Sequence, residues 1–365
     1  MKKDSLFVKL ITLFLFATVV SCSPDNGGDN GSDDGDNGKL PLGPDICYVL
    51  NNGNWGGNDA SIQQYSTTTG VATPGDANNN IFVIENGTLL GDLAQSMLWI
   101  DDKLFVSVGG SQKLEILDEN GKRLREPYLF AETGAQARML ATDGDNIYLT
   151  NYDGNVYVYS VETADSVRKI KVGIRPEGIS YIDGYLVVNN SGELGKYNGT
   201  LSIVNLATND VRSIQLLNPY TASVVCNGKV YIIDSGNYTD VPSQIYAVSP
   251  QEGTVTPLGI SASAIASYGN ILYYVNNEWS FEVNDYVPSP LYALNVTTGE
   301  KSELLTADKM VGVNSLSVNP DTGDIFIGYN REYGVLGYIC IYDAQGVKRG
   351  EFSAGYYPGG VYFEN

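Results

Sequence analysis

Residues 139–159, MLATDGDNIYLTNYDGNVYVY, contain the pattern that decides the fold. Two short runs rich in apolar residues, Ile147-Tyr148-Leu149 and Val156-Tyr157-Val158-Tyr159, are separated by a stretch that contains Asn, Asp and Gly. A similar group, Asp143-Gly144-Asp145-Asn146, precedes the first run. Alternating apolar residues between such turn-forming groups predict short antiparallel strands joined by tight turns.

This pattern recurs with a period of about 40 residues. Each copy contains three or four apolar runs split by Gly, Asn or Asp turns, which predicts a four-stranded unit. A repeat of this length and strand content is typical of a β-propeller blade. The copies span residues 94–134, 135–174, 175–217, 218–260, 261–306 and 307–355.

The two ends of the repeat region supply one further blade. Residues 357–363, YPGGVYF, resemble residues 175–181, RPEGISY, which form the first strand of a repeat. Residues 46–50 and 61–65 have the pattern of a second and a third strand without a first. Joining the ends completes a blade and leaves no open sheet edge. We therefore predict an all-β, seven-bladed β-propeller over residues 45–365, closed by the C-terminal strand; a miscounted copy would give six or eight blades.

The first 44 residues have the features of a lipoprotein leader. Lysines precede an apolar run at residues 10–20 that is too short to span a bilayer, as in a secretory signal. Val19-Val20-Ser21-Cys22 resembles the bacterial lipobox, in which the Cys is lipidated, although a signal peptide with an incidental Cys is the alternative. We expect a signal peptide over residues 1–21 and a lipid anchor on Cys22.

An acidic segment follows the expected anchor. Residues 23–38 carry five Asp among Asn, Gly and Ser and contain no large apolar side chain. Such a segment cannot bury enough apolar surface to fold, so residues 22–44 are expected to form a flexible tether. The segment also resembles the surface-export signal of Bacteroidetes lipoproteins. We therefore expect a lipid-anchored protein at the cell surface of the outer membrane.

Composition narrows the class of partner. With 22 basic and 42 acidic residues the formal charge is −20, which disfavours nucleic acid because no basic stripe is present to bind phosphates. Cys47, Cys226 and Cys340 stand singly in strand-like runs, so we expect small buried apolar residues, with a disulfide between two of them as the alternative.

The chain contains no histidine, which removes the commonest general base and the commonest transition-metal ligand. Neither a Gly-x-Ser-x-Gly elbow nor a phosphate-binding Gly-rich loop is present. Glu177, Asp234 and Glu332 lie near expected loop ends, where carboxylates with nearby Asn side chains can bind a hard cation as in propeller lactonases. Asn at a strand end more often caps the backbone, so we predict no enzyme and no cofactor.

One face of the predicted ring collects the longer loops. In a propeller the loops between second and third strands and the segments between blades emerge on the same face, where ligands usually bind. These segments carry aromatic, amide and arginine side chains that suit a broad, rigid ligand. The predicted ligand-binding residues are Trp55, Arg138, Asn151, Tyr152, Arg175, Tyr197, Tyr220, Tyr238, Trp279, Phe281, Tyr286, Tyr333 and Tyr357.

Three stretches carry a family resemblance. Residues 51–61, NNGNWGGNDAS, then residues 86–97, and the strand turn at residues 319–326, NPDTGDIF, resemble YncE-like propeller lipoproteins of Bacteroidetes. That group includes the BtuG proteins, which capture cobalamin and pass it to a TonB-dependent outer-membrane transporter. The resemblance implies a corrinoid as the small-molecule ligand and such a transporter as the partner. The alternatives are a surface scaffold that binds protein or glycan and a metal-dependent, lactonase-like hydrolase.

Overall fold

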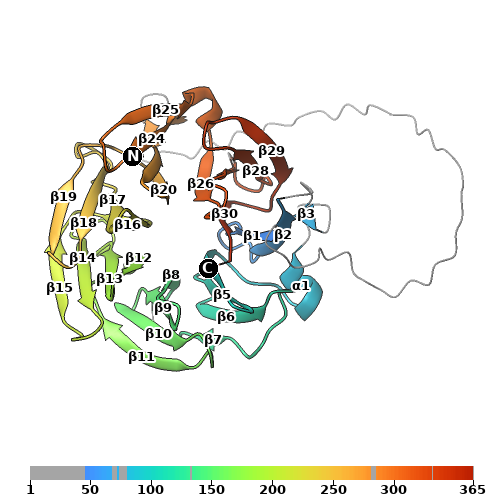
Figure 1. Ribbon diagram of the computed structural model, residues 1–365. Helices are drawn as coiled ribbons and strands as arrows, with labels where there is room; N and C mark the ends of the chain where they lie inside the picture. The colour runs from blue at the N-terminus through green and yellow to red at the C-terminus, as the bar shows by residue number, and fades with distance from the viewer. Residues whose placement is uncertain are drawn as a thin grey trace, which may run out of the picture. The chain divides into compact units, whose positions relative to one another are not determined.

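The computed structural model describes residues 46–67, 72–73, 80–131, 134–280, 285–330 and 332–364. The expected signal peptide, Cys22 and the acidic tether lie outside these residues. Figure 1 shows the described chain as a ring of sheets around a central axis. Seven sheets contain four antiparallel strands each, which confirms the predicted seven-bladed β-propeller.

Six blades follow one another along the chain, and we number them blade 1 to blade 6. Their strands run from the inside of the ring to its rim in sequence order. Blade 1 contains β4 (Ala94–Ile100), β5 (Lys103–Val108), β6 (Lys113–Asp118) and β7 (Tyr128–Leu129); blade 2 contains β8 (Ala137–Thr142), β9 (Asn146–Asn151), β10 (Asn155–Ser160) and β11 (Ser166–Lys171); blade 3 contains β12 (Pro176–Ile182), β13 (Tyr185–Asn190), β14 (Thr200–Asn205) and β15 (Val211–Gln215).

The later blades follow the same plan. A two-stranded hairpin, β22 (Glu278–Ser280) with β23 (Asp285–Val287), is inserted in blade 5. Blade 4 contains β16 (Pro219–Cys226), β17 (Lys229–Asp234), β18 (Gln244–Ser249) and β19 (Thr254–Pro257); blade 5 contains β20 (Ala264–Tyr268), β21 (Ile271–Val275), β24 (Leu291–Asn295) and β25 (Lys301–Leu305); blade 6 contains β26 (Val313–Val318), β27 (Ile325–Tyr329), β28 (Tyr338–Tyr342) and β29 (Lys348–Ser353).

The closing blade joins both ends of the ring. Its strands are β30 (Pro358–Tyr362) inside, then β1 (Ile46–Asn51), β2 (Ser61–Ser66) and β3 (Ala72–Thr73). Strand β30 pairs antiparallel with β1, with Val361 opposite Val49. Both side chains are buried, at 5% and 0% exposure. The predicted closure is confirmed, and β30 leaves no edge of β1 unpaired.

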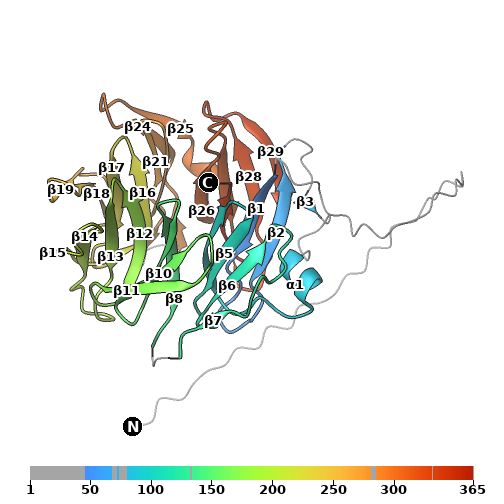
Figure 2. The same cartoon turned by 60° about the horizontal axis from the view of Figure 1, so that its bottom comes forward.

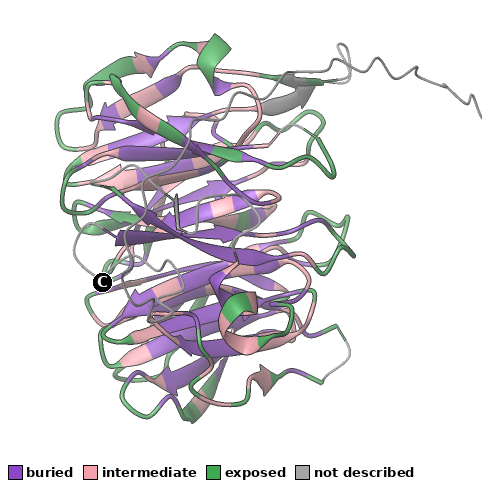
Figure 3. Cartoon of the chain, turned by 90° about the vertical axis from the view of Figure 1, so that its right-hand side faces the viewer, coloured by how far each residue is buried: buried purple, intermediate pink, exposed green. Residues whose placement is uncertain are grey.

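The cores lie between the sheets of neighbouring blades. Figure 3 shows the strands largely buried and the connecting turns exposed. Side chains of second strands also donate to backbone carbonyls of the inner strand of the next blade. Thr150 Oγ1 donates to Glu177 O over 2.6 Å, and Asn189 Nδ2 donates to Tyr220 O over 2.7 Å. These bonds connect the second strands of blades 2 and 3 to the inner strands of blades 3 and 4.

Two short helices of the described chain lie in segments that connect blades. Helix α1 (Ile81–Asn86) packs against β2 at the rim of the ring and buries Ile81 and Phe82 (Figure 2). It ends at Gly87, whose φ of 63° suits glycine and whose N–H donates to Val83 O over 2.8 Å. A 3₁₀ turn, η1 (Ala307–Met310), precedes β26. Neither helix was predicted, and in the described part of the chain no helix is long and apolar enough to cross a membrane.

The cysteines of the described chain are free and buried. Cys47, Cys226 and Cys340 have exposures of 0%, 2% and 5%, and none of them forms a disulfide. The prediction that they act as small buried residues is confirmed.

Candidate functional site

Strand order defines two unlike faces of the ring. Because the strands of each blade alternate in direction, loops from second to third strands share one face with the segments that connect blades. We call this the loop face. Turns from first to second and from third to fourth strands lie on the opposite face, the turn face. Every described residue of the predicted ligand-binding set belongs to a segment of the loop face.

A buried ion pair lies at the start of two neighbouring inner strands. Arg138 is the second residue of β8 and Glu177 the second residue of β12. Arg138 Nε donates to Glu177 Oε2 over 2.7 Å, and the side chains are 7% and 0% exposed. Arg138 Nη2 also donates to the hydroxyl of Tyr220, the second residue of β16, over 3.3 Å. The same position in three successive blades therefore supplies one connected cluster.

Tyr152 completes this cluster from the loop between β9 and β10. Its hydroxyl donates to Glu177 Oε1, and its ring lies beneath two guanidinium groups. The Arg138 guanidinium carbon is 4.8 Å from the ring centroid, and that of Arg175 is 4.4 Å from it. Both distances allow a cation–π attraction. We call Arg138, Tyr152, Arg175, Glu177 and Tyr220 the Arg–Glu cluster.

Burial shapes the acid–base behaviour of the cluster. Burial raises the pKa of the Glu177 carboxyl, and the positive charge of Arg138 together with the Tyr152 hydrogen bond acts in the opposite direction. The nearby carboxylate raises the pKa of Arg138 in spite of its burial, so the arginine stays charged. Burial and the negative charge of Glu177 raise the pKa of Tyr152. The Tyr152 hydroxyl therefore stays protonated and serves as the donor to Glu177 Oε1.

An aromatic wall borders the cluster on the blade 4 side. Tyr220 is 40% exposed and Tyr238 is 61% exposed. Tyr238 lies edge to face with Tyr197, with 6.4 Å between ring centroids, and its hydroxyl accepts a hydrogen bond of 3.2 Å from Asn218 Nδ2. The loops of blades 3 and 4 thus present aromatic surface beside the two arginines.

A second aromatic platform joins the closing blade to blade 6. Trp55 is 82% exposed and Tyr333 is 68% exposed. The Tyr333 hydroxyl donates to the backbone O of Trp55 over 3.4 Å, and Gly334 N–H donates to Asn54 Oδ1 over 2.9 Å. The loops that carry the two rings are therefore connected directly, although 278 positions separate the residues in sequence.

The described exposed aromatic side chains show a strong asymmetry between the faces. There are six of them, with exposures from 37% to 82%, and each lies in a loop or at a strand end of the loop face. Aromatic rings are large apolar surfaces that binding sites commonly use. The six residues are Trp55, Tyr197, Tyr220, Tyr238, Tyr333 and Tyr338.

Asn151 lies at the end of β9 and is fully buried. Its Oδ1 accepts the N–H of Gln136, in the segment that enters blade 2, over 3.0 Å. Asn190 and Asp234 occupy the same place in blades 3 and 4, where their side-chain oxygens accept N–H groups of Gly173 and Leu217. The structure thus shows that Asn151 accepts a backbone N–H of the segment that connects blades 1 and 2.

The remaining predicted residues are placed as follows. Tyr357 has a φ of 51°, and its backbone O accepts the N–H of Asn52 over 2.8 Å, so its main chain helps to close the ring. Trp279 and Tyr286 pair across the hairpin of β22 and β23, but their side chains are not described. Phe281 lies outside the described residues. The ligand contacts predicted for these four residues stay predictions.

Sequence reasoning named Glu177 only as one of three carboxylates that can bind a hard cation, and it missed the pairing of Glu177 with Arg138. The sequence contains a signal for this cluster, because Arg138, Glu177 and Tyr220 occupy the same position in three successive repeats, directly after the first residue of an inner strand. The other proposed carboxylates lie elsewhere: Asp234 accepts N–H groups of Leu217, Asn218 and Gly236, and Glu332 is exposed. Among the described residues no group of three His, Cys, Asp or Glu side chains is arranged to hold a metal ion.

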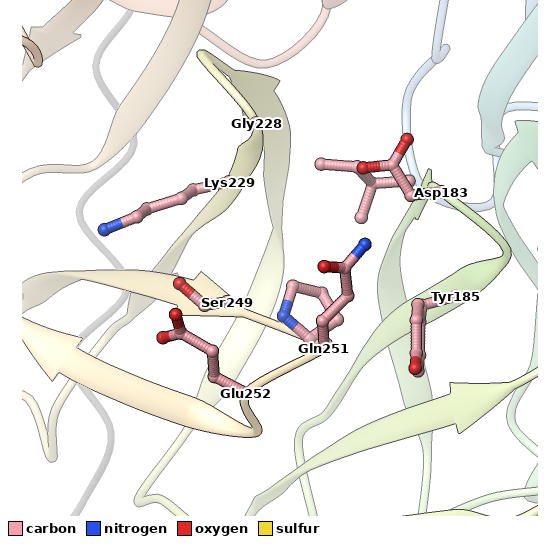
Figure 4. A pocket seen from close by; sticks show the side chains of 9 residues that line it. Asp183, Tyr185, Gly228, Lys229, Ser249, Gln251 and Glu252 are labelled. Carbon is pink, nitrogen blue, oxygen red and sulfur yellow. The ribbon is translucent and has the colours of Figure 1, made fainter.

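The described chain also has one hollow at the centre of the ring and another on the turn face. The central channel, of about 490 Å³, is lined by the inner strands and includes Met139, Ile179 and Thr221, which lie next to or close to the Arg–Glu cluster in sequence. A smaller hollow of about 190 Å³ lies on the turn face between blades 3 and 4, where Asp183, Tyr185, Lys229 and Glu252 line it (Figure 4). Small-molecule sites usually enclose about 300–1,000 Å³, so the smaller hollow lies below the usual size of such a site.

Comparisons with known proteins agree with the fold. No family model and no curated protein sequence matches the chain. A quinoprotein alcohol dehydrogenase-like protein from Bacteroides thetaiotaomicron is 14% identical with a TM-score of 0.59, and the alignment covers 88% of this chain and 78% of the other. The computationally designed Ika8 protein is 13% identical with a TM-score of 0.54, covering 88% and 93%. Hydrazine synthase of Kuenenia stuttgartiensis is 11% identical with a TM-score of 0.53, covering 73% and 86%.

At these identities the likeness shows the fold alone. The protein is a seven-bladed β-propeller, and its structural neighbours are proteins of different kinds, so they assign no activity to this chain.

Proposed function

We propose that this protein is a non-enzymatic capture lipoprotein that binds a corrinoid on the loop face and passes it to a TonB-dependent outer-membrane transporter. The observation that carries the proposal is the concentration of exposed aromatic side chains on the loop face. In the free protein the apolar surface of the exposed Trp and Tyr rings is in contact with water. A ligand that covers them gains this apolar burial.

A corrinoid has the shape and chemistry that this surface suits. It is broad and rigid, with an apolar ring system and an amide fringe. Rigid ligands lose little conformational entropy on binding, so flat contacts with aromatic rings contribute more of their free energy to affinity. The platform of Trp55 and Tyr333 offers such contacts, and the Tyr238 hydroxyl of the aromatic wall is a polar group for hydrogen bonds with the amide fringe.

The sequence supports the cellular role. The lipobox-like Val19-Val20-Ser21-Cys22 and the acidic segment after it favour a lipid anchor and display at the cell surface. The stretches that resemble YncE-like propeller lipoproteins, including residues 51–61 around Trp55, favour nutrient capture over other propeller functions. Hand-off to a TonB-dependent transporter rests on the same resemblance.

Calorimetry on the detergent-solubilised full-length protein tests the proposal. Cobalamin or cobinamide is expected to bind, and Trp55→Ala and Tyr333→Ala are each expected to weaken affinity about tenfold, which corresponds to about 1.4 kcal/mol. Val347→Ala, which changes an exposed residue of the turn face, serves as the matched control and is expected to leave affinity unchanged. Absence of binding heat for both corrinoids at micromolar protein would overturn the proposal. Capture of a transporter or glycan by a corrinoid-free protein would then favour the scaffold alternative.

A further inference from the structure

Arg175 brings a second positive charge to the Arg–Glu cluster, where its guanidinium carbon is 4.4 Å from the Tyr152 ring centroid. The Arg138 guanidinium is paired with Glu177, whose second oxygen is occupied by Tyr152. Arg175 forms no ion pair with any described carboxylate, and its Nε is buried without a hydrogen-bond partner. A buried donor without a partner costs about 1–3 kcal/mol, so the hydrogen-bonding capacity of this guanidinium is not fully used within the protein.

The surroundings hold this guanidinium in place. Arg175 precedes Pro176, the first residue of β12, and its backbone O accepts hydrogen bonds from the Ser191 N–H and Oγ over 3.0 and 3.2 Å. Its guanidinium stacks on Tyr152, which Glu177 holds in turn. Little side-chain entropy therefore remains to be lost when a ligand binds.

The charges of the cluster do not cancel. Arg138 and Glu177 form a neutral pair, and Arg175 adds one positive charge. The chain as a whole carries −20, so general electrostatics repel an anion from this protein. Attraction of an anion to this protein would therefore depend on the local, partly buried Arg175 charge and not on the net charge of the chain.

Aromatic surface lies beside the positive charge. The hydroxyls of Tyr220 and Tyr152 interact with each other, and Tyr238 is the exposed ring next along the wall. A ligand with an acidic group on Arg175 would bring its flat apolar part against these rings. Arginine recognises carboxylate and phosphate groups through paired N–H donors, which a lysine cannot reproduce.

We propose that Arg175 and the adjoining tyrosines form a binding site for an organic anion, in which a phosphate or carboxylate group pairs with the Arg175 guanidinium and a flat apolar portion packs on Tyr220 and Tyr238. This inference deepens the proposed function, on which it rests for the use of the loop face as a ligand surface. It assigns a separate chemical requirement, a negative charge, to one part of that surface.

The test uses phenyl phosphate, inorganic phosphate and benzyl alcohol as probes in calorimetry with the full-length protein at low salt. Phenyl phosphate is expected to bind more tightly than either of the others, because only it offers both charge and ring. Arg175→Gln is expected to weaken phenyl phosphate at least tenfold, and Arg175→Lys is expected to restore only part of the affinity. Lys196→Gln, which removes an exposed positive charge of the same face, is the control and is expected to change affinity less than twofold.

Two results would overturn the proposal. One is a lower melting temperature for Arg175→Gln with phenyl phosphate affinity within twofold of wild type, which would leave Arg175 a purely structural role. The other is equal binding of phenyl phosphate and benzyl alcohol. If Arg175→Gln does not fold, nuclear magnetic resonance of the wild-type protein replaces it. The Arg175 Nε–H signal is identified as the one that disappears in Arg175→Lys. If that signal does not shift when phenyl phosphate is added, the result counts against the site.

The outcome is separable from that of the corrinoid experiment. Phenyl phosphate binding without corrinoid binding would retain the anion site and overturn the proposed function. Corrinoid binding that is unaffected by Arg175→Gln, together with no phenyl phosphate binding, would retain the proposed function and overturn the anion site.

Discussion

Arg138 and Glu177 form a buried ion pair, with 2.7 Å between Nε and Oε2, that joins the inner strands of blades 2 and 3. Neither residue has an ion partner in its own blade among the described residues. The pair therefore ties two blades together at the end of the channel that meets the loop face, and it also places Tyr152 and Tyr220.

Removing one member of this pair should be costly. Glu177→Gln leaves Arg138 buried and charged without its carboxylate, which is expected to lower the free energy of unfolding by about 3–5 kcal/mol. Urea unfolding followed by tryptophan fluorescence measures the loss. Glu193→Gln, at an exposed position in the loop of blade 3, is the control and is expected to change stability by less than about 0.5 kcal/mol. A loss below about 1 kcal/mol for Glu177→Gln would show that Arg138 finds another partner or water.

Much of the fold could be predicted because the evidence for it is local and repeated. Alternating apolar runs and turn residues define each blade, and residues 357–363 resemble residues 175–181 closely enough to predict the closure through β30. Helix α1 was not predicted, since six residues with a buried Ile81 and Phe82 depend on packing against β2 more than on helix propensity.

The site was predicted only as a set of positions on one face. Which residues touch depends on the ring, because neighbouring blades bring together residues that are distant in sequence. Arg138 and Glu177 are 39 positions apart, nearly one repeat, so alignment of the repeats would have paired them. The contact between Tyr333 and Trp55 depends on closure of the whole ring, and no local pattern reports it.

Asn151 provides a test that separates a structural from a ligand-binding role. Its Oδ1 accepts the Gln136 N–H, as Asp234 accepts the Leu217 N–H in blade 4. Asn151→Ala removes this acceptor and is expected to cost about 1–3 kcal/mol of stability in thermal or urea unfolding. Asn151→Asp keeps the oxygen and is the matched control, expected to retain most of the stability. Equal stability of the two variants would contradict the capping role.

Glu115 predicts a pH dependence of stability. Burial raises the pKa of its carboxyl, but hydrogen bonds from Arg123 and Lys113 outweigh burial, so the folded-state pKa is lowered. A lowered pKa means that the unfolded chain binds this proton more tightly. The stabilisation is therefore full above the unfolded pKa of about 4.3 and is lost as pH falls through the folded pKa.

Glu115→Gln removes this contribution. At pH 7 the variant is expected to be less stable than wild type by about 1–3 kcal/mol, and the difference is expected to shrink as pH falls below about 4. Urea midpoints measured between pH 3 and pH 7 give the comparison, with Glu300→Gln in an exposed turn as the control. A difference that stays constant over this range would show that the ionised carboxylate is not the source of the stabilisation.

The buried thiols give a measurement that reports directly on blade packing. Burial raises the pKa of Cys226 to about 11 and also raises the pKa of Cys47 and of Cys340, so few thiolates exist at pH 8. The native protein is therefore expected to react with Ellman's reagent much more slowly than the unfolded protein, in which all three thiols react. Cys47 lies in β1 of the closing blade and Cys226 lies in β16 of blade 4. Mass spectrometry of the labelled peptides therefore compares the extent of labelling in the closing blade with that in another blade. Selective labelling of Cys47 under native conditions would show that the closing blade opens while the other blades stay folded.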